Sequence, residues 1–286
     1  MTEPTASLLP DGRLHLNHGP IDLVISADGA PEAVELAFEA AAGRFATILV
    51  ELVDELPLLR WPARADTHAT GLVASRMVAA VVPHAEATFI TPMAAVAGAV
   101  ADEILDVMTA AAPLTRVFVN NGGDIAIHLS GGQRAHARLA AHDGTEIGRA
   151  AIVSGDGVGG IATSGRDGRS FSLGIADAVT VLAASAAEAD AAATLIANAV
   201  DLADHPAVTR APADTLDPDS DLGSRLVTTH CGPLRDDEKR LALADGAATA
   251  RRMMAAGLIR GAALFLQGRS RILGGGRQIV RERPEE

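Results

Sequence analysis

Residues 116–129 read RVFVNNGGDIAIHL, two apolar runs on either side of the polar segment NNGGD. The apolar runs have the composition of β-strands, and the adjacent glycines Gly122 and Gly123 allow the positive φ angles of a tight turn. The stretch therefore predicts a β-hairpin. The turn has two possible roles. It reverses the chain and does nothing more, or it also forms part of the floor of a ligand site. The answer depends on which other segments of the chain lie beside it.

Long helical patterns occur on both sides of this hairpin. Apolar residues recur at helical spacing in five segments. Proline, the Ser185–Glu188 capping pair or Gly257 marks an end of each segment. The expected helices cover 31–56, 67–82, 91–112, 185–204 and 236–257. Shorter apolar or alternating runs predict strands at 13–17, 21–26, 87–90, 134–141, 145–154, 178–185, 224–230 and a closing hairpin at 259–276.

This mixture of hairpins and long helices predicts an α+β fold, with mixed or antiparallel sheets packed against long helices, rather than a regular βαβ series. We expect one large domain over 13–276, a flexible tail over 1–12 and a charged tail over 277–286. The segment 204–222 is rich in proline and aspartate and predicts a surface loop.

The composition excludes several classes of function. Only 2% of the 286 residues are aromatic, the formal net charge is −12, and no basic patch interleaves with aromatics, which argues against a nucleic-acid partner. No apolar stretch is long enough to span a membrane, and the first 30 residues carry charges without a signal-peptide core. We therefore expect a soluble, cytoplasmic protein.

The glycine-rich segment GDGVGGIATSGRDGRSF at 155–171 has two interpretations. Gly157, Gly159 and Ala162 match a dinucleotide fingerprint, but the following residues do not read as a helix, so a Rossmann site is disfavoured. The segment is either a plain loop between strands or a site where backbone N–H groups and hydroxyls meet an anion. In the second case the residues involved are Gly159, Gly160, Thr163 and Ser164.

Asp190 and Thr194 lie four residues apart in an alanine-rich helical pattern and share one helix face. A carboxylate with a hydroxyl one turn later can hold a hard cation such as Mg²⁺, with phosphates, carbonyls and water as further ligands. The alternative is an aspartate that merely favours the helix N-terminus. Similarly, the start of the helix after Thr91–Pro92 can receive an anion or can simply pack closely through its small residues.

The histidines and the single cysteine give weak signals. The nine histidines are scattered without a metal-binding spacing, and Cys231 and His230 are adjacent on a predicted strand, so their side chains point to opposite faces. Neither a zinc site nor a Cys–His nucleophile is supported.

Three segments together resemble the ApbE superfamily: NNGGDI, GGIATSG and AVTVLAASAAEADAAATLIANA. An ApbE-like branch also matches HGPIDL, FATILVELVDELPLLR, TFITPMAAVAGAVAD and GRSFSLGIADAVTVLA, so the resemblance covers most of residues 13–275. The resemblance implies an ApbE-like fold and Mg²⁺-dependent chemistry on FAD, in which FMN is transferred to a threonine or serine of a target protein.

By position, the resemblance implies metal ligands at Asp190, Thr194 and the backbone carbonyl near Ala94. It implies that a flavin, FAD or FMN, is lined by Asn120, Asn121, Gly122, Gly123, Asp124, Gly160, Ala162, Thr163 and Ser164. On this interpretation NNGGD is both the turn and part of the ligand floor.

The chain departs from the transferase pattern at two places. Ala97 stands where the transferases carry a lysine, and FSLGIADAVTV lacks their His-x-x-Asp-Pro-x-Thr-Gly stretch. Two hypotheses follow: an enzyme that transfers FMN or hydrolyses the FAD pyrophosphate, or a non-catalytic accessory protein, for example in sulfur assimilation, that still binds a nucleotide. A homo-oligomeric scaffold without a small ligand is the third alternative.

Overall fold

The computed structural model of the chain describes residues 3–140, 146–274 and 279–280. Most of the expected tail at 277–286 lies outside these residues. The chain forms two compact units that each draw on several segments. Unit 1 holds Met1–Arg134, Val153–Ala162 and Ala183–Ala191, and unit 2 holds Ala135–Ile152, Thr163–Leu182 and Ala192–Glu286. The single domain over 13–276 stays a prediction.

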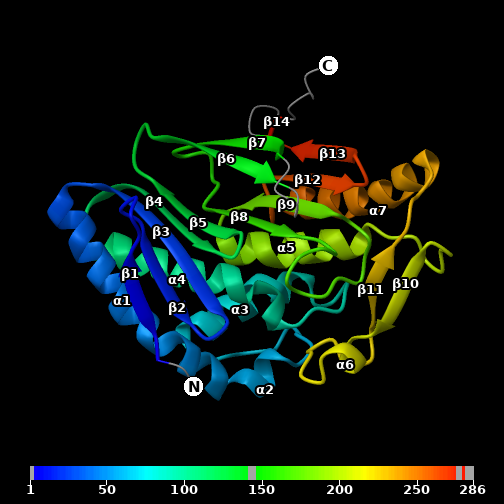
Figure 1. Ribbon diagram of the computed structural model, residues 1–286, viewed down its shortest axis with the longest axis horizontal. Helices are drawn as coiled ribbons and strands as arrows, with labels where there is room; N and C mark the ends of the chain where they lie inside the picture. Colours follow the sequence, from blue (N-terminus) through cyan, green and yellow to red (C-terminus); the bar gives the residue numbers. More distant parts are fainter. Residues whose placement is uncertain (1–2, 141–145, 275–278, 281–286) are drawn as a thin grey trace. The chain divides into compact units, whose positions relative to one another are not determined.

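Unit 1 is built on an antiparallel sheet (Figure 1). Its strands follow the order β1 (Thr5–Leu8), β2 (Leu14–His18), β3 (Ile21–Gly29), β4 (Leu114–Asn121), β5 (Asp124–Leu129) and β8 (Gly160–Ser164), whose first three residues belong to this unit. Alternate residues of β2 and β3 are buried, because one face of the sheet packs on helices and the other faces solvent.

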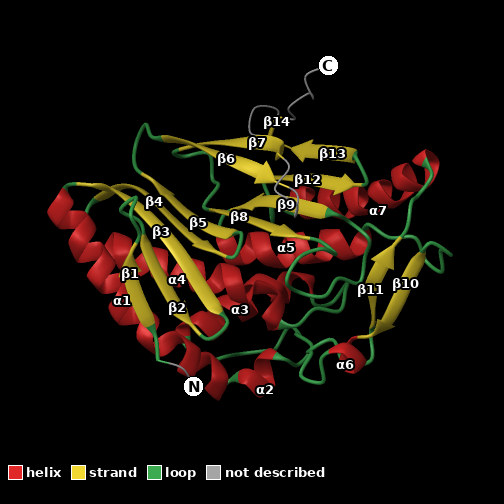
Figure 2. Cartoon of the chain, in the orientation of Figure 1, coloured by secondary structure: helices red, strands yellow, loops and turns green. Residues whose placement is uncertain are grey.

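The helices of unit 1 are α1 (Pro31–Asp54), α2 (Leu56–Leu59), α3 (Leu72–Val81) and α4 (Val96–Ala111), with the 3₁₀ turns η1 (Val82–His84) and η2 (Pro92–Ala95). Figure 2 shows α1 and α4 against the sheet. In α4 every residue from Gly98 to Leu105 is buried, including Asp102 and Glu103. Two buried carboxylates in one apolar helix require compensating partners.

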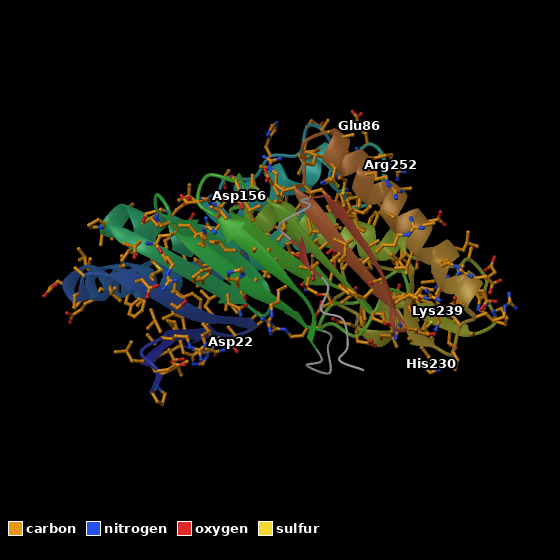
Figure 3. The ribbon with its side chains drawn as sticks, turned by 90° about the horizontal axis from the view of Figure 1, so that it is seen from above. Asp22, Glu86, Asp156, His230, Lys239 and Arg252 are labelled. Atoms are coloured by element: carbon orange, nitrogen blue, oxygen red, sulfur yellow. The ribbon has the colours of Figure 1, made fainter. Side chains whose placement is uncertain are left out.

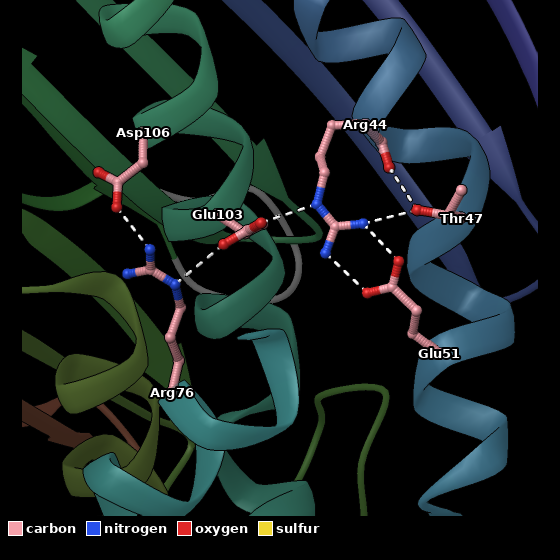
Figure 4. Close-up of polar contacts among 6 residues, drawn as sticks. All are labelled: Arg44, Thr47, Glu51, Arg76, Glu103 and Asp106. Carbon is pink, nitrogen blue, oxygen red and sulfur yellow. Dashed lines mark hydrogen bonds and ion pairs between the residues drawn. The ribbon is translucent and has the colours of Figure 1, made fainter. Parts of the chain in front are cut away.

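Glu103 finds its partners on two other helices (Figure 4). Its Oε1 accepts a hydrogen bond from Arg44 Nε of α1 at 2.7 Å, and its Oε2 accepts one from Arg76 Nε of α3 at 3.1 Å. Arg44 also binds Glu51, and Arg76 also binds Asp106. The buried carboxylate of Glu103 therefore ties α4 to both α1 and α3.

Unit 2 contains three groups of strands. Antiparallel pairs join β9 (Ala178–Ala183), β12 (Gly261–Leu266) and β13 (Arg269–Gly274); β10 (Val208–Pro212) pairs with β11 (Leu226–Cys231); and β7 (Glu146–Val153) lies between β14 (Ile279–Val280) and β6 (Arg134–Ala140). Helix α7 (Asp236–Ala255) packs on β12 and β13 and carries Arg252 on its exposed face (Figure 3).

The remaining helices are α6 (Ala213–Leu216) in unit 2 and α5 (Ala186–Ala199), which begins in unit 1 and ends in unit 2. The α+β class is confirmed by this mixture of helices with antiparallel strands. In the part of the chain that the structure describes, no helix combines the length and apolar character needed to cross a bilayer.

Several expectations differ from the structure. The helix expected at 185–204 ends at Ala199, and the helix expected from 91 starts as the 3₁₀ turn η2 before α4 begins at Val96. Thr5–Leu8 of the expected tail pair with β2, because an edge strand needs only main-chain partners. The helix expected at 67–82 begins at Leu72, because the Glu55 carboxylate accepts the N–H groups of Thr70 and Gly71 and holds Gly71 in an extended conformation.

Two further differences concern strands. Residues 87–90 form no strand, since Ile90 accepts only a loop hydrogen bond from Ala63 N–H. The expected loop at 204–222 contains β10 and α6, because β10 finds its antiparallel partner in β11.

Candidate functional site

The NNGGD segment is a two-residue hairpin turn, as the sequence predicts. Asn121 and Asp124 are the last register pair of β4 and β5, and Gly122 and Gly123 between them have φ angles of 66° and 117°. Asn120 Oδ1 accepts a hydrogen bond from Gly123 N–H at 2.8 Å. A side chain at either glycine would be strained at these φ angles, so the turn depends on both.

One side of this turn contacts the start of α4. Asn121 is 5% exposed, and its Nδ2 donates to the carbonyl oxygen of Ala97 at 3.1 Å. Residues directly opposite in an antiparallel pair carry their side chains on the same face. Asp124, the register partner of Asn121, therefore also faces the first turn of α4.

Asp190 of α5 meets the same turn of α4. Its Oδ2 accepts a hydrogen bond from Gly98 N–H at 3.1 Å. Burial raises the pKa of Asp190 well above its ordinary value, and the carboxylate of Asp124 raises it further, while the N–H groups of Gly98 and Ala97 oppose the rise. Two carboxylates, an amide side chain and a helix N-terminus thus converge within unit 1.

The N-terminus of α5 is closed by protein groups. Asp102 of α4 is 6% exposed and accepts hydrogen bonds from Ala186 N–H and Ala187 N–H, both at 2.9 Å. Ser185 Oγ accepts one from Glu188 N–H at 3.2 Å, which confirms the capping role expected for Ser185. Burial raises the pKa of the Asp102 carboxyl to about 6, and the two N–H donors oppose that rise.

Helices α4 and α5 touch at backbone level at Gly98. A Cβ atom at Gly98 would lie 2.3 Å from the carbonyl oxygen of Ala186. We expect Gly98→Ala to lower the free energy of unfolding by about 1–3 kcal/mol, since the helices must separate to admit the methyl group. Chemical denaturation measures this, with Gly43→Ala on the exposed side of α1 as the control, because a Cβ there meets no atom within 4 Å. Equal stability of the Gly98 variant and the wild type would contradict the close approach.

Asp102 should make stability depend on pH. The folded state binds its proton more tightly than the unfolded state, so its stabilising contribution is complete below about pH 4 and is lost as the pH rises through about 6. Between about pH 4.5 and about pH 7.5, wild-type stability should fall by about 2 kcal/mol relative to Asp102→Asn. Urea unfolding of both proteins at both pH values measures this; a constant difference would contradict the raised pKa.

The glycines at 159 and 160 pack against backbone. Gly159 N–H donates to Ala183 O at 3.0 Å, and Gly159 O accepts from Ile127 N–H at 2.8 Å. A Cβ atom at Gly160 would lie 2.2 Å from Ala186 N. Close packing of the backbone explains why residues 159 and 160 are glycines, and it also buries Ala162. Their part in ligand binding stays a prediction.

The other expected site residues are placed as follows. Ala94 lies half-buried in η2 of unit 1, and its N–H donates to Thr91 O at 3.1 Å. In unit 2, Thr163 is exposed with its Oγ1 2.8 Å from Thr180 Oγ1, while Ser164 and Thr194 are half-buried. Their roles as flavin and metal contacts stay predictions.

The donor set near Asp190 is made of oxygen atoms. Within residues 3–140, 146–274 and 279–280, no three side chains of His, Cys, Asp or Glu gather closely enough to hold a metal by themselves. Asp190 and Asp124 supply two carboxylates, which suit a hard cation that keeps further oxygen ligands from water or phosphate. The sequence resemblance assigns Asp124 to the flavin lining; in the structure its negative charge also raises the pKa of Asp190.

A family model matches most of the chain. The model of the family described as AbpE bacteria matches residues 6–272. A UPF0280 protein of Methanopyrus kandleri is 41% identical over 121 residues, 40% of this chain and 45% of the relative. A UPF0280 protein of Methanocaldococcus jannaschii is 37% identical over 114 residues, 38% and 44% respectively. The chain thus spans less than half the length of the curated relatives it matches.

Two solved structures are also similar. The apo form of the flavinyl transferase ApbE of Pseudomonas stutzeri shares 13% identity, with 99% of this chain and 95% of that chain covered and a TM-score of 0.38. The flavin transferase ApbE of Vibrio cholerae shares 14% identity, with coverages of 94% and 96% and a TM-score of 0.37.

Proposed function

This chain belongs to the family described as AbpE bacteria, and on that premise we propose that it binds a flavin or another phosphate-bearing nucleotide together with Mg²⁺ beside the β4–β5 turn. The observation that carries the proposal is that Asp190 and the β4–β5 turn meet the same first turn of α4. Asp190 accepts a hydrogen bond from Gly98 N–H, and Asn121, the register partner of Asp124, donates one to Ala97 O. Like charges that approach each other in a partly buried place are stabilised by a cation between them.

The residues present fit Mg²⁺. Asp190 and Asp124 offer carboxylate oxygens, which Mg²⁺ prefers, and Gly98 N–H holds the Asp190 carboxylate in one orientation. The sequence resemblance adds the Thr194 hydroxyl and the carbonyl near Ala94 as further ligands. Asp190 and Asp124 would hold the cation, which would supply neutralisation of phosphate charge, while Asn121 fixes the turn against α4.

The turn itself suits a nucleotide. Gly122 and Gly123 are exposed and carry no side chain beyond hydrogen, so a flat or phosphate-bearing ligand can approach their backbone closely. This supports the expectation that residues 120–124 line the ligand.

The proposed activity is Mg²⁺-dependent FMN transfer or hydrolysis of the FAD pyrophosphate. The second candidate is an accessory protein, for example in sulfur assimilation, that binds the nucleotide without transfer chemistry. Ala97 favours the second candidate, because it places a methyl group in the first turn of α4 where the transferase pattern has a lysine.

Equilibrium titration with FAD, FMN and ATP, with and without Mg²⁺, tests binding. The proposal expects at least one nucleotide to bind more tightly when Mg²⁺ is present; no binding to any of the three would reject it. Incubation with FAD and Mg²⁺, with chromatography for released FMN, then separates the candidates: FMN release supports the enzyme, and binding without turnover supports the accessory protein.

A further inference from the structure

Helices α4 and α5 hold each other's first turns through a pair of aspartates. Asp102 of α4 accepts the N–H groups of Ala186 and Ala187 in α5, and Asp190 of α5 accepts the N–H group of Gly98 in α4. In each helix the aspartate follows the bonded N–H by four residues, Gly98 to Asp102 and Ala186 to Asp190, so the arrangement is reciprocal. We call these five residues the α4–α5 clasp: Gly98, Asp102, Ala186, Ala187 and Asp190.

The clasp leaves the helices little freedom to move against each other. A Cβ atom at Gly98 would lie only 2.3 Å from Ala186 O and 2.4 Å from Ala186 C, so the backbones are already in contact. Asp102 is buried, and both of its oxygens are bonded to α5. Moving the first turn of α5 away from α4 would therefore break two hydrogen bonds of a buried carboxylate.

Helix α4 is in turn fixed to the rest of unit 1. The neighbouring residue Glu103 binds Arg44 of α1 and Arg76 of α3, as Figure 4 shows. Two consecutive residues of α4 therefore bond to different helices. Glu103 bonds to α1 and α3, and Asp102 bonds to α5. Asp190, one turn inside α5, takes its position from this chain of contacts.

We propose that Asp102 is a positioning residue for cation binding: it bonds the first turn of α5 and thereby sets where the Asp190 carboxylate lies. The inference rests on the proposed function, since it requires Asp190 to hold the cation. Asp102 itself has both oxygens on the backbone of α5 and does not touch the cation.

The first test compares Asp102→Asn with Ser185→Ala by calorimetric titration with Mg²⁺ alone. Each change removes a side-chain oxygen that accepts an N–H group in the first turn of α5. Asp102 lies on α4, whereas Ser185 precedes α5 itself, so only the first change removes a bond between the two helices. The dissociation constant for Mg²⁺ should rise by about tenfold or more in Asp102→Asn, as is typical when a supporting residue of a metal site is lost. It should stay within about twofold of wild type in Ser185→Ala.

A second variant separates position from charge. Asp102→Glu keeps the negative charge but adds a methylene group in a buried contact, so it should displace the start of α5 and also weaken Mg²⁺ binding. If Asp102→Glu binds Mg²⁺ as tightly as wild type while Asp102→Asn does not, the charge of Asp102 and not its position matters, and the inference is overturned.

A measurement on the wild type covers the case in which neither variant folds, which circular dichroism reveals. Saturating Mg²⁺ should slow amide hydrogen exchange at Ala186 and Ala187 together with Gly98, because Asp190 belongs to both the clasp and the cation site. Slower exchange at Gly98 with no change at Ala186 and Ala187 would overturn the inference. Failure of the wild type to bind Mg²⁺ would reject the proposed cation site as well, whereas wild-type binding with an unchanged affinity in Asp102→Asn overturns the positioning role alone.

Discussion

Replacing Glu103 by alanine should lower the free energy of unfolding by about 3–5 kcal/mol, the usual effect of removing one partner from a buried ion pair. The Glu103 side chain is 4% exposed and lies between Arg44 and Arg76. Its loss leaves two guanidinium groups with fewer acceptors and removes the contact that ties α4 to α1 and α3. Urea unfolding followed by circular dichroism measures the change.

Asp106→Ala is the matched control for this prediction. Asp106 lies one turn later on α4 and also binds Arg76, but its side chain is 60% exposed. Solvent screens an exposed pair, so the control should cost no more than about 1 kcal/mol. If both substitutions have equal effects, burial does not determine the strength of the network in Figure 4.

Asp190→Asn should stabilise the metal-free protein and abolish its response to Mg²⁺. Burial raises the pKa of Asp190, so the folded state disfavours its ionised form. At every pH above the folded pKa the ionised carboxylate costs stability that a neutral amide does not. With Mg²⁺ at one hundred times its dissociation constant, the wild type should gain about 2.7 kcal/mol and the variant nothing.

Glu188→Gln provides the control, because it removes the same charge from the first turn of the same helix at a residue outside the proposed cation site. This variant should respond to Mg²⁺ as the wild type does. Thermal unfolding with and without Mg²⁺ measures all three proteins. A Mg²⁺ response that survives in Asp190→Asn would show that the cation binds elsewhere.

Local chemistry explains which parts of the fold the sequence predicts. The β4–β5 turn follows from adjacent Gly122 and Gly123, and the start of α5 follows from Ser185 with Glu188, three residues on. Both features depend on neighbours within a few positions, where residue preferences are strongest.

Contacts between distant residues explain what the sequence does not predict. Asp102 accepts hydrogen bonds from residues 84 and 85 positions away. Glu55 accepts the N–H groups of residues 15 and 16 positions away, and these bonds move the start of α3 to Leu72. The sequence offers one hint of the clasp: Asp102 and Glu103 interrupt an otherwise small and apolar helical run, and such buried carboxylates require specific partners.

The sequence predicts some residues of the candidate site but not the contacts that bring them together. Asn121 and Asp190 are expected site residues, and the structure joins them through Ala97 and Gly98 at the start of α4. Asp124 raises the pKa of Asp190 only because the hairpin and α5 reach the same end of α4, so neither segment of the sequence reveals this effect alone.

We expect a cation to bind between the β4–β5 turn and the first turns of α4 and α5. Crystals grown with Mn²⁺ in place of Mg²⁺ and examined by anomalous scattering test it directly. The expected result is a peak within about 2.5 Å of a carboxylate oxygen of Asp190, with Asp124 facing the same peak. A crystal with Mn²⁺ bound elsewhere, and none at Asp190, would show that this turn holds no cation.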